Sequence, residues 1–79
     1  MTKTDQTIHE AVSEAIRLVN TKPGLTYVHL RFADDPYEVD FVANSASAGN
    51  GRFEFQAGIE TYEGRIEELS EIRTETIVH

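Results

Sequence analysis

The sequence predicts an α+β fold with two layers, in which one N-terminal helix packs on a mostly antiparallel sheet of about four strands. Two periodicities and the short connections support this prediction. Apolar residues recur at helical spacing near the N-terminus, and from Leu25 onward they recur at every second position, the spacing of a half-buried strand. The connections between the predicted strands are short, so we expect neighbouring strands to form hairpins.

A single domain is expected over residues 1–79, because a chain this short buries only about 60% of the surface that its unfolded form exposes. The absence of cysteine excludes disulfide bonds, thiolate metal sites and a cysteine nucleophile. The N-terminal segment lacks the apolar core of a signal peptide, and no apolar run approaches the length of a membrane span. We therefore expect a cytoplasmic protein whose stability comes from packing alone.

The helix is predicted at about residues 5–20. Its apolar residues fall on one stripe, and Lys22-Pro23-Gly24 ends it, because proline cannot continue a helix and disfavours helical geometry in the residue before it. The stripe consists of Ile8, Ala11, Val12, Ala15, Ile16 and Val19. One face of the helix should therefore be buried against the sheet.

Three strands are predicted from the alternation of apolar and polar residues. The first follows Leu25, a turn at residues 33–38 leads into the second, and the third follows a loop of small residues. The residues expected to face the core are Val28, Leu30 and Phe32 in the first strand, Val39 and Phe41 in the second, and Phe53, Phe55, Ala57 and Ile59 in the third. Gly58 interrupts the third strand, so we expect a bulge or a close backbone approach there.

The segment NSASAGNG, residues 44–51, is predicted to be a mobile hairpin loop. A phosphate-binding loop would lead into a helix and would carry a lysine followed by serine or threonine after its glycines. Here Arg52 and a strand follow instead, and the dinucleotide-binding fingerprint is also missing. The sequence therefore predicts no phosphate site, although such a loop could become ordered on contact with a partner.

Two interpretations of residues 60–72 stay open. As a helix, the segment has an apolar stripe from Tyr62 and a ladder of glutamates. As a hairpin, TYEGR forms a turn with Gly64 in the left-handed conformation, and the chain returns from Arg65 as a fourth strand that ends in IRTETIVH. We favour the hairpin, because glycine costs roughly 1 kcal/mol inside a helix. The fourth strand then needs a bulge near Glu67-Glu68.

The formal net charge is −7, and the acidic residues concentrate toward the C-terminus. Residues 59–79 hold six acids against two bases, whereas residues 1–24 hold three of each. Such a surface repels nucleic acids and anionic membranes, so we expect neither as a direct partner. Another protein with a basic surface is the favoured partner.

Carboxylates in the C-terminal third are the candidate partner-binding residues. They could occupy a basic groove in place of nucleic acid phosphates, although charge runs also keep small proteins soluble. The six are Glu60, Glu63, Glu67, Glu68, Glu71 and Glu75.

No catalytic residue, cofactor or metal site is predicted. The histidines lack the i, i+4 spacing of a zinc site, and the serines lack a nucleophile motif. The residues in question are His9, His29 and His79, and Ser45, Ser47 and Ser70.

Charged residues on the outer face of the predicted sheet could form an acid–base group, because opposite charges on neighbouring strands come within reach of each other. They are His29 and Arg31, beside Glu38, Asp40 and Glu54. Weak ion pairs on a solvated face are the favoured interpretation, since such pairs contribute under about 1 kcal/mol each.

The expected function is that of a small acidic protein-interaction module, such as an inhibitor or nucleic-acid mimic that acts on a basic nucleic-acid-handling protein of the kind encoded by mobile elements. One alternative is a homo-oligomeric structural or accessory subunit that pairs through an edge strand such as IRTETIVH, with Ile77 and Val78 as contacts. Another is a small-ligand binder or enzyme that uses the outer sheet face. We do not expect an enzyme, because no second layer forms a pocket over that face.

Overall fold

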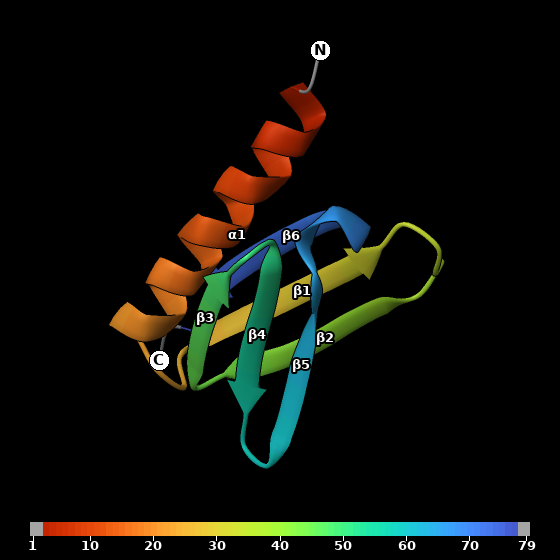
Figure 1. The fold of residues 1–79 in the computed structure, drawn as a ribbon. Helices are drawn as coiled ribbons and strands as arrows, with labels where there is room; N and C mark the ends of the chain where they lie inside the picture. The colour runs from red at the N-terminus through yellow and green to blue at the C-terminus, as the bar shows by residue number, and fades with distance from the viewer. Residues whose placement is uncertain (1–2, 78–79) are drawn as a thin grey trace.

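A computed structural model describes residues 3–77 of the chain, and Figure 1 shows their fold as one helix and six strands. The elements are helix α1 (Lys3–Thr21), strands β1 (Thr26–Phe32), β2 (Glu38–Ala43), β3 (Ser45–Gly49), β4 (Arg52–Ala57) and β5 (Glu60–Arg65), the 3₁₀ turn η1 (Ile66–Glu68) and strand β6 (Leu69–Thr76). The predicted α+β class with an N-terminal helix is confirmed. The number of strands is higher than the four expected.

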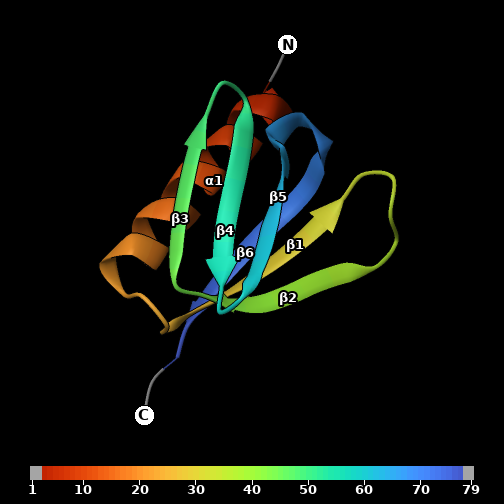
Figure 2. The ribbon, with the colours of Figure 1, turned by 60° about the horizontal axis from the view of Figure 1, so that its bottom comes forward.

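The strands form two antiparallel sheets of three, with the orders β2-β1-β6 and β3-β4-β5, which we call sheet A and sheet B. The chain passes from sheet A to sheet B at Asn44 and returns through η1. In Figure 2, sheet B lies in front of sheet A, and α1 packs along the side formed by β3 and β6. The core therefore lies between two sheets and a helix, rather than between one sheet and a helix.

The apolar stripe of α1 faces the core as predicted, and the helix ends before Pro23. Three residues of the stripe are buried, Val12, Ala15 and Val19, and three are partly buried against the same core, Ile8, Ala11 and Ile16. None of residues 3–77 belongs to a helix long and apolar enough to cross a membrane.

Thr26 joins the end of α1 to the start of β1. Its side chain is fully buried, and its hydroxyl lies 3.3 Å from the carbonyl oxygens of both Leu18 and Lys22, to which it can donate. The two carbonyl oxygens also accept backbone hydrogen bonds from the Lys22 and Leu25 N–H groups, at 2.9 and 3.1 Å, whereas a buried hydroxyl without a partner is costly. The contact therefore gives the buried hydroxyl of Thr26 its partners where the helix meets sheet A.

Aromatic side chains connect the two sheets. Phe41 of sheet A stacks on Tyr62 of sheet B with ring centroids 4.1 Å apart, and it lies 5.6 Å from the ring of Phe55. Phe32 of sheet A approaches Phe53 of sheet B with centroids 6.2 Å apart. Such aromatic pairs contribute about 0.5–1.5 kcal/mol each beyond the burial of their surface. The predicted inward positions of these phenylalanines are thus correct, but they face each other across two sheets.

Residues 44–51 are not a loop, which corrects the prediction. Ser45–Gly49 forms β3 and pairs with β4, and only Asn50 and Gly51 form the turn. Both turn residues have positive φ, 55° and 75°, as in a type I′ hairpin turn, for which Asn-Gly is a favoured pair. Small side chains add little to the stability of a strand, so β3 depends on its neighbours.

Asn20 of α1 covers the outer edge of β3. Its side-chain amide donates to the carbonyl oxygen of Ala46 at 2.9 Å, and its side-chain oxygen accepts from the Ala46 N–H at 3.1 Å. The side chain thus pairs with both backbone groups of Ala46, as a neighbouring strand would. The edge of a sheet otherwise leaves such groups unpaired.

The hairpin after β4 turns earlier in the chain than predicted. Gly58 and Ile59 form the turn, and the positive φ of Gly58, 65°, suits the first position of a two-residue hairpin loop. Gly58 therefore marks a turn and not a bulge inside a strand. Ile59, predicted to face the core, is 96% exposed at the tip.

The helical interpretation of residues 60–72 is wrong, and the favoured hairpin interpretation places its turn wrongly. Residues 60–65 form β5, so Gly64 lies inside a strand. The interruption expected near Glu67-Glu68 takes the form of η1, after which β6 runs antiparallel to β1.

Gly64 is favoured by space rather than by backbone conformation, because its φ is not positive. It lies directly opposite Phe53, and a Cβ added at Gly64 would lie 3.3 Å from the Phe53 ring. Phe53 is only 2% exposed, so its ring has little room to move. The missing side chain therefore makes space for a core aromatic ring.

We predict that Gly64→Val lowers the free energy of unfolding by about 1–3 kcal/mol, because its methyl groups overpack the core against Phe53. Urea unfolding followed by circular dichroism measures the change. Gly49→Val is the matched control, since Gly49 lies in β3 and a Cβ there meets no atom within 4 Å. We expect the stability of Gly49→Val to stay within about 0.5 kcal/mol of wild type. Equal losses of stability in both variants would contradict the role of the Phe53 contact.

Candidate functional site

The outer face of sheet A carries charged side chains in cross-strand rows. Every second residue of β1, β2 and β6 points outward, where neighbours on adjacent strands meet. The register places His29 between Asp40 and Arg73, in the middle of this face. The whole group, which we call the sheet A cluster, consists of His29, Arg31, Glu38, Asp40, Glu71, Arg73 and Glu75.

His29 is the centre of the sheet A cluster. Its Nδ1 lies 2.8 Å from Oδ1 of Asp40 and 3.1 Å from Oε2 of Glu38. Its Nε2 lies 3.0 Å from Oε2 of Glu75. The side chain is only 10% exposed, and the ring of Tyr27 lies beside it with centroids 4.5 Å apart. Both ring nitrogens therefore face carboxylates in a largely desolvated position.

These contacts favour the protonated imidazole of His29. Burial by itself lowers the pKa of His29, but the hydrogen bonds to Asp40, Glu38 and Glu75 outweigh burial and raise the pKa above its ordinary value of 6.5. In the protonated form both ring nitrogens donate, which matches the carboxylates on either side of the ring.

Two arginines hold the far oxygen of Glu38. Nη2 of Arg73 lies 3.1 Å from Oε1 of Glu38, and Nη2 of Arg31 lies 3.7 Å from the same atom. Nε of Arg73 also lies 3.3 Å from a carboxylate oxygen of Glu71. Glu38 is thus oriented with one oxygen toward the arginines and the other toward His29.

His29, Glu38 and Asp40 each bring a possible metal-ligating atom to the same point. The three ligand atoms all lie within 4.8 Å of one another. The two carboxylates stand nine and eleven positions after the histidine, so no local motif indicates the group. The antiparallel register of β1 and β2 brings it together, which a search for helical i, i+4 spacing does not detect.

Glu54 does not join this group, which corrects the prediction of one acid–base face. It lies on β4, and β4 belongs to sheet B. The prediction assumed a single sheet, in which the alternate residues of all strands share a face. The other four residues of that prediction, His29, Arg31, Glu38 and Asp40, do share the outer face of sheet A.

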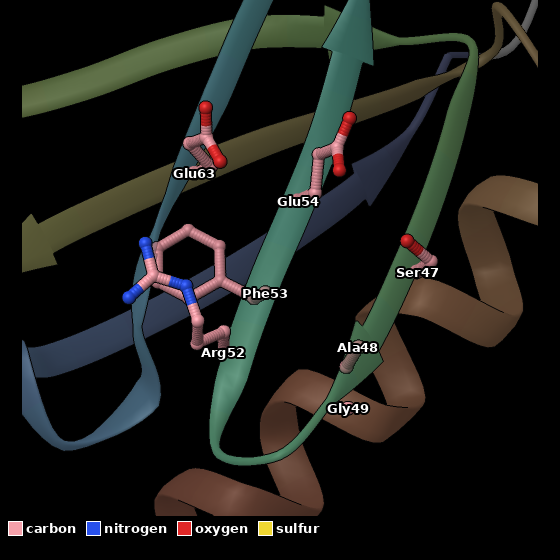
Figure 3. A pocket seen from close by; sticks show the side chains of 7 residues that line it. All are labelled: Ser47, Ala48, Gly49, Arg52, Phe53, Glu54 and Glu63. Carbon is pink, nitrogen blue, oxygen red and sulfur yellow. The ribbon is translucent and has the colours of Figure 1, made fainter.

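The outer face of sheet B carries a pair of like charges. Glu54 and Glu63 are directly opposite each other on β4 and β5, and Ser47 is next in the row on β3. Figure 3 shows these three side chains in line, with Arg52 nearer the β3–β4 turn. The small Ser47 and Gly49 leave an open, shallow depression beside the two carboxylates.

This pair of glutamates has no cation in direct contact among the side chains that the structure describes. The ion pairs within 4.0 Å among residues 8–77 involve neither Glu54 nor Glu63. Like charges directly opposite each other on adjacent strands destabilise a sheet. Their repulsion is lessened by the charges of Arg52 and Arg65, which oppose each other in the adjacent row of the same face.

The β4–β5 hairpin also carries an exposed apolar side chain at its tip. Ile59 is the most exposed large apolar residue that the structure describes. The turn is held in place, because the N–H of Gly58 donates to the side-chain oxygen of Asn44 at 2.7 Å. Glu60 follows at the first position of β5 and is also exposed.

The six glutamates predicted to bind a partner lie on several surfaces and do not form one array. Glu71 and Glu75 belong to the sheet A cluster, Glu63 lies on the outer face of sheet B, Glu60 lies beside the β4–β5 turn, and Glu67 and Glu68 lie in η1. Three of them have a cationic or histidine side chain of the same chain within 4.0 Å, namely Glu67, Glu71 and Glu75. Glu68 accepts a hydrogen bond from the Arg65 N–H at 3.4 Å.

The remaining candidates lie apart from these surfaces or from each other. His9 is exposed on α1, and His79 lies outside the described residues. The Ser70 hydroxyl donates to the carbonyl oxygen of Arg31 at 3.2 Å. Ser45 and Ser47 lie on the outer face of sheet B, on the opposite sheet from His29.

Comparison of the chain with known proteins finds no matching family model and no significant match to a curated protein or a solved structure.

We predict that His29 makes the stability of the metal-free protein depend on pH. A folded-state pKa raised above the unfolded value means that the protonated His29 stabilises the fold at low pH, and that this contribution is lost as pH rises through the folded-state pKa. Urea unfolding in EDTA between pH 6 and pH 9 should show a loss of stability that His29→Gln removes. His9→Gln, at an exposed helical position, should keep the wild-type slope. A slope that His29→Gln leaves unchanged would refute this role.

Proposed function

We propose that the protein is an acidic interaction module that binds a basic surface of another protein through its β4–β5 hairpin. The observation that carries the proposal is that Glu54 and Glu63 oppose each other, with no described cation within 4.0 Å, on the hairpin whose tip exposes Ile59. A lysine or arginine of a partner that approaches the two carboxylates would relieve their repulsion.

The apolar tip adds to the same proposal. Burying an isoleucine side chain on association contributes about 1.5–3 kcal/mol. A single exposed apolar side chain is ordinary on a protein surface. Here it lies at the end of a short turn anchored by Asn44 and next to Glu60, so an apolar contact and carboxylates would meet a partner together.

Only some of the six glutamates expected from the sequence belong to the proposed partner surface. Glu67, Glu71 and Glu75 interact with cationic or histidine side chains of their own chain, so they have less free charge to offer. The centre of the binding surface moves to Glu60 and Glu63, with Glu54 added. A cytoplasmic partner that handles nucleic acid through a basic groove is the class we propose, because its groove is built to receive anions. The proposal requires no catalytic group.

We predict that Glu54→Lys/Glu63→Lys abolishes capture of a basic partner when the tagged protein is used as bait in a lysate of its native host. Wild type should retain the partner at low salt and release it at high salt, because screening weakens contacts between exposed charges. Ile59→Ser should weaken the recovered complex by at least about tenfold, as expected for the loss of an apolar anchor.

The matched control is Glu10→Lys/Asp34→Lys, which makes the same change in net charge at two exposed positions, one on α1 and one before β2. It should bind like wild type. Binding that survives both high salt and Glu54→Lys/Glu63→Lys, or that is lost equally in the control, would contradict the proposal.

A second copy of this chain is the alternative partner, through an edge strand. The strand expected for this role, β6, lies at an edge of sheet A, and α1 packs against it. Ile77 donates its N–H to the carbonyl oxygen of Leu25 at 2.7 Å, and Val78 lies outside the described residues. Light scattering separates the cases: a stable dimer that Ile59→Ser leaves intact would favour the edge-strand alternative over the proposed hairpin surface.

A further inference from the structure

We propose that the sheet A cluster binds one divalent metal ion of the zinc class, with Nδ1 of His29 and carboxylate oxygens of Glu38 and Asp40 as its protein ligands. One nitrogen and two oxygens suit the borderline ions of this class, and they suit Mg²⁺ or Ca²⁺ less well. Three protein ligands would leave further positions to water or to a small ligand, as in zinc sites that are not fully enclosed by protein.

The distances fit such an ion with a small adjustment. Ligand atoms at about 2.0–2.2 Å from a tetrahedral metal lie roughly 3.4 Å from one another. Nδ1 of His29 now lies 2.8 Å from Asp40 and 3.1 Å from Glu38, and all three ligand atoms lie within 4.8 Å of one another. The two distances from Nδ1 would lengthen by a few tenths of an ångström, and rotation of the carboxylate side chains would set the distance between their two oxygens.

The partners around these ligands also fit a metal site. Glu75 lies 3.0 Å from Nε2 of His29, so it can accept the Nε2–H of a neutral imidazole and leave Nδ1 free to bind the ion. A carboxylate in this position orients a metal-bound histidine and increases its basicity. Arg31 and Arg73 hold the far oxygen of Glu38 and so aim the near oxygen at the same point.

The charge of the cluster is complementary to a divalent cation. With neutral His29, its four carboxylates exceed its two guanidinium groups by two negative charges. The His29 side chain is nine-tenths buried, so water screens this excess less than it would at an open surface. A divalent ion would balance it, whereas a proton on His29 balances only half of it.

The proposed metal site lies on sheet A, whereas the proposed partner surface lies on the β4–β5 hairpin of sheet B. None of the metal ligands belongs to the partner surface, so a negative result for one site leaves the other unaffected.

The test uses the full chain, stripped with EDTA and titrated with Zn²⁺ by calorimetry and with Co²⁺ by absorption spectroscopy. We expect one saturable site per chain, with affinity that falls as pH is lowered because the ion displaces a proton from His29. His29→Ala should lower the affinity at least about 100-fold, and Glu75→Ala, which removes only the orienting carboxylate, about 10–100-fold. His9→Ala is the control and should bind like wild type.

An amide NMR titration with Zn²⁺ keeps the inference testable if a variant folds poorly. Shifts confined to the neighbourhood of His29, Glu38, Asp40 and Glu75 would support the site in the wild-type chain. Shifts centred on Glu54 and Glu63, no binding at millimolar Zn²⁺, or binding that His29→Ala leaves unchanged would overturn it.

Discussion

The structure depends on the contact between its two small sheets. Each sheet has only three strands, and a sheet of this size is stable only when its apolar face is covered. Phe41, stacked on Tyr62 and close to Phe55, supplies that cover across the interface, and α1 closes the side where β3 and β6 lie. The inner faces therefore belong to one core, and neither sheet is a separate unit.

This shared core determines what the outer faces can present. Because Val28 and Leu30 are buried, His29 between them must point outward. The antiparallel register of β1 and β2 then gathers carboxylates around the ring of His29. The same rule places Glu54 opposite Glu63 on sheet B, behind the buried Phe53 and Phe55. On each sheet, the candidate surface lies on the outer face, and it is set by the apolar residues that pack on the inner face of the same strands. The two surfaces differ in that acids of sheet A have cationic or histidine side chains within 4.0 Å, whereas the described side chains place none that close to Glu54 or Glu63.

Much of the fold could be predicted from periodicity, and the errors have identifiable causes. The stripe of α1 and the alternation in β1, β2 and β4 identified these elements, because large apolar side chains mark the buried side. The strand at Ser45–Gly49 has no such side chains, and its best signal was the Asn50-Gly51 turn pair. Glycine at position 64 was expected to provide the left-handed conformation of a turn. It instead leaves space for the ring of Phe53, and a contact between two strands cannot be read from one sequence. The sheet A group was predicted in part, and Glu54 was added to it only because a second sheet was not foreseen.

Native-state hydrogen exchange followed by NMR tests the central claim, the shared core, most directly. If the two sheets form one cooperative unit, the backbone amides of Leu30 in β1 and Phe55 in β4 should exchange with the same free energy of opening, equal to the global free energy of unfolding. Protection at Leu30 with much faster exchange at Phe55 would show that sheet B opens independently. That result would contradict the account, because the surfaces of the two sheets would then no longer depend on one core.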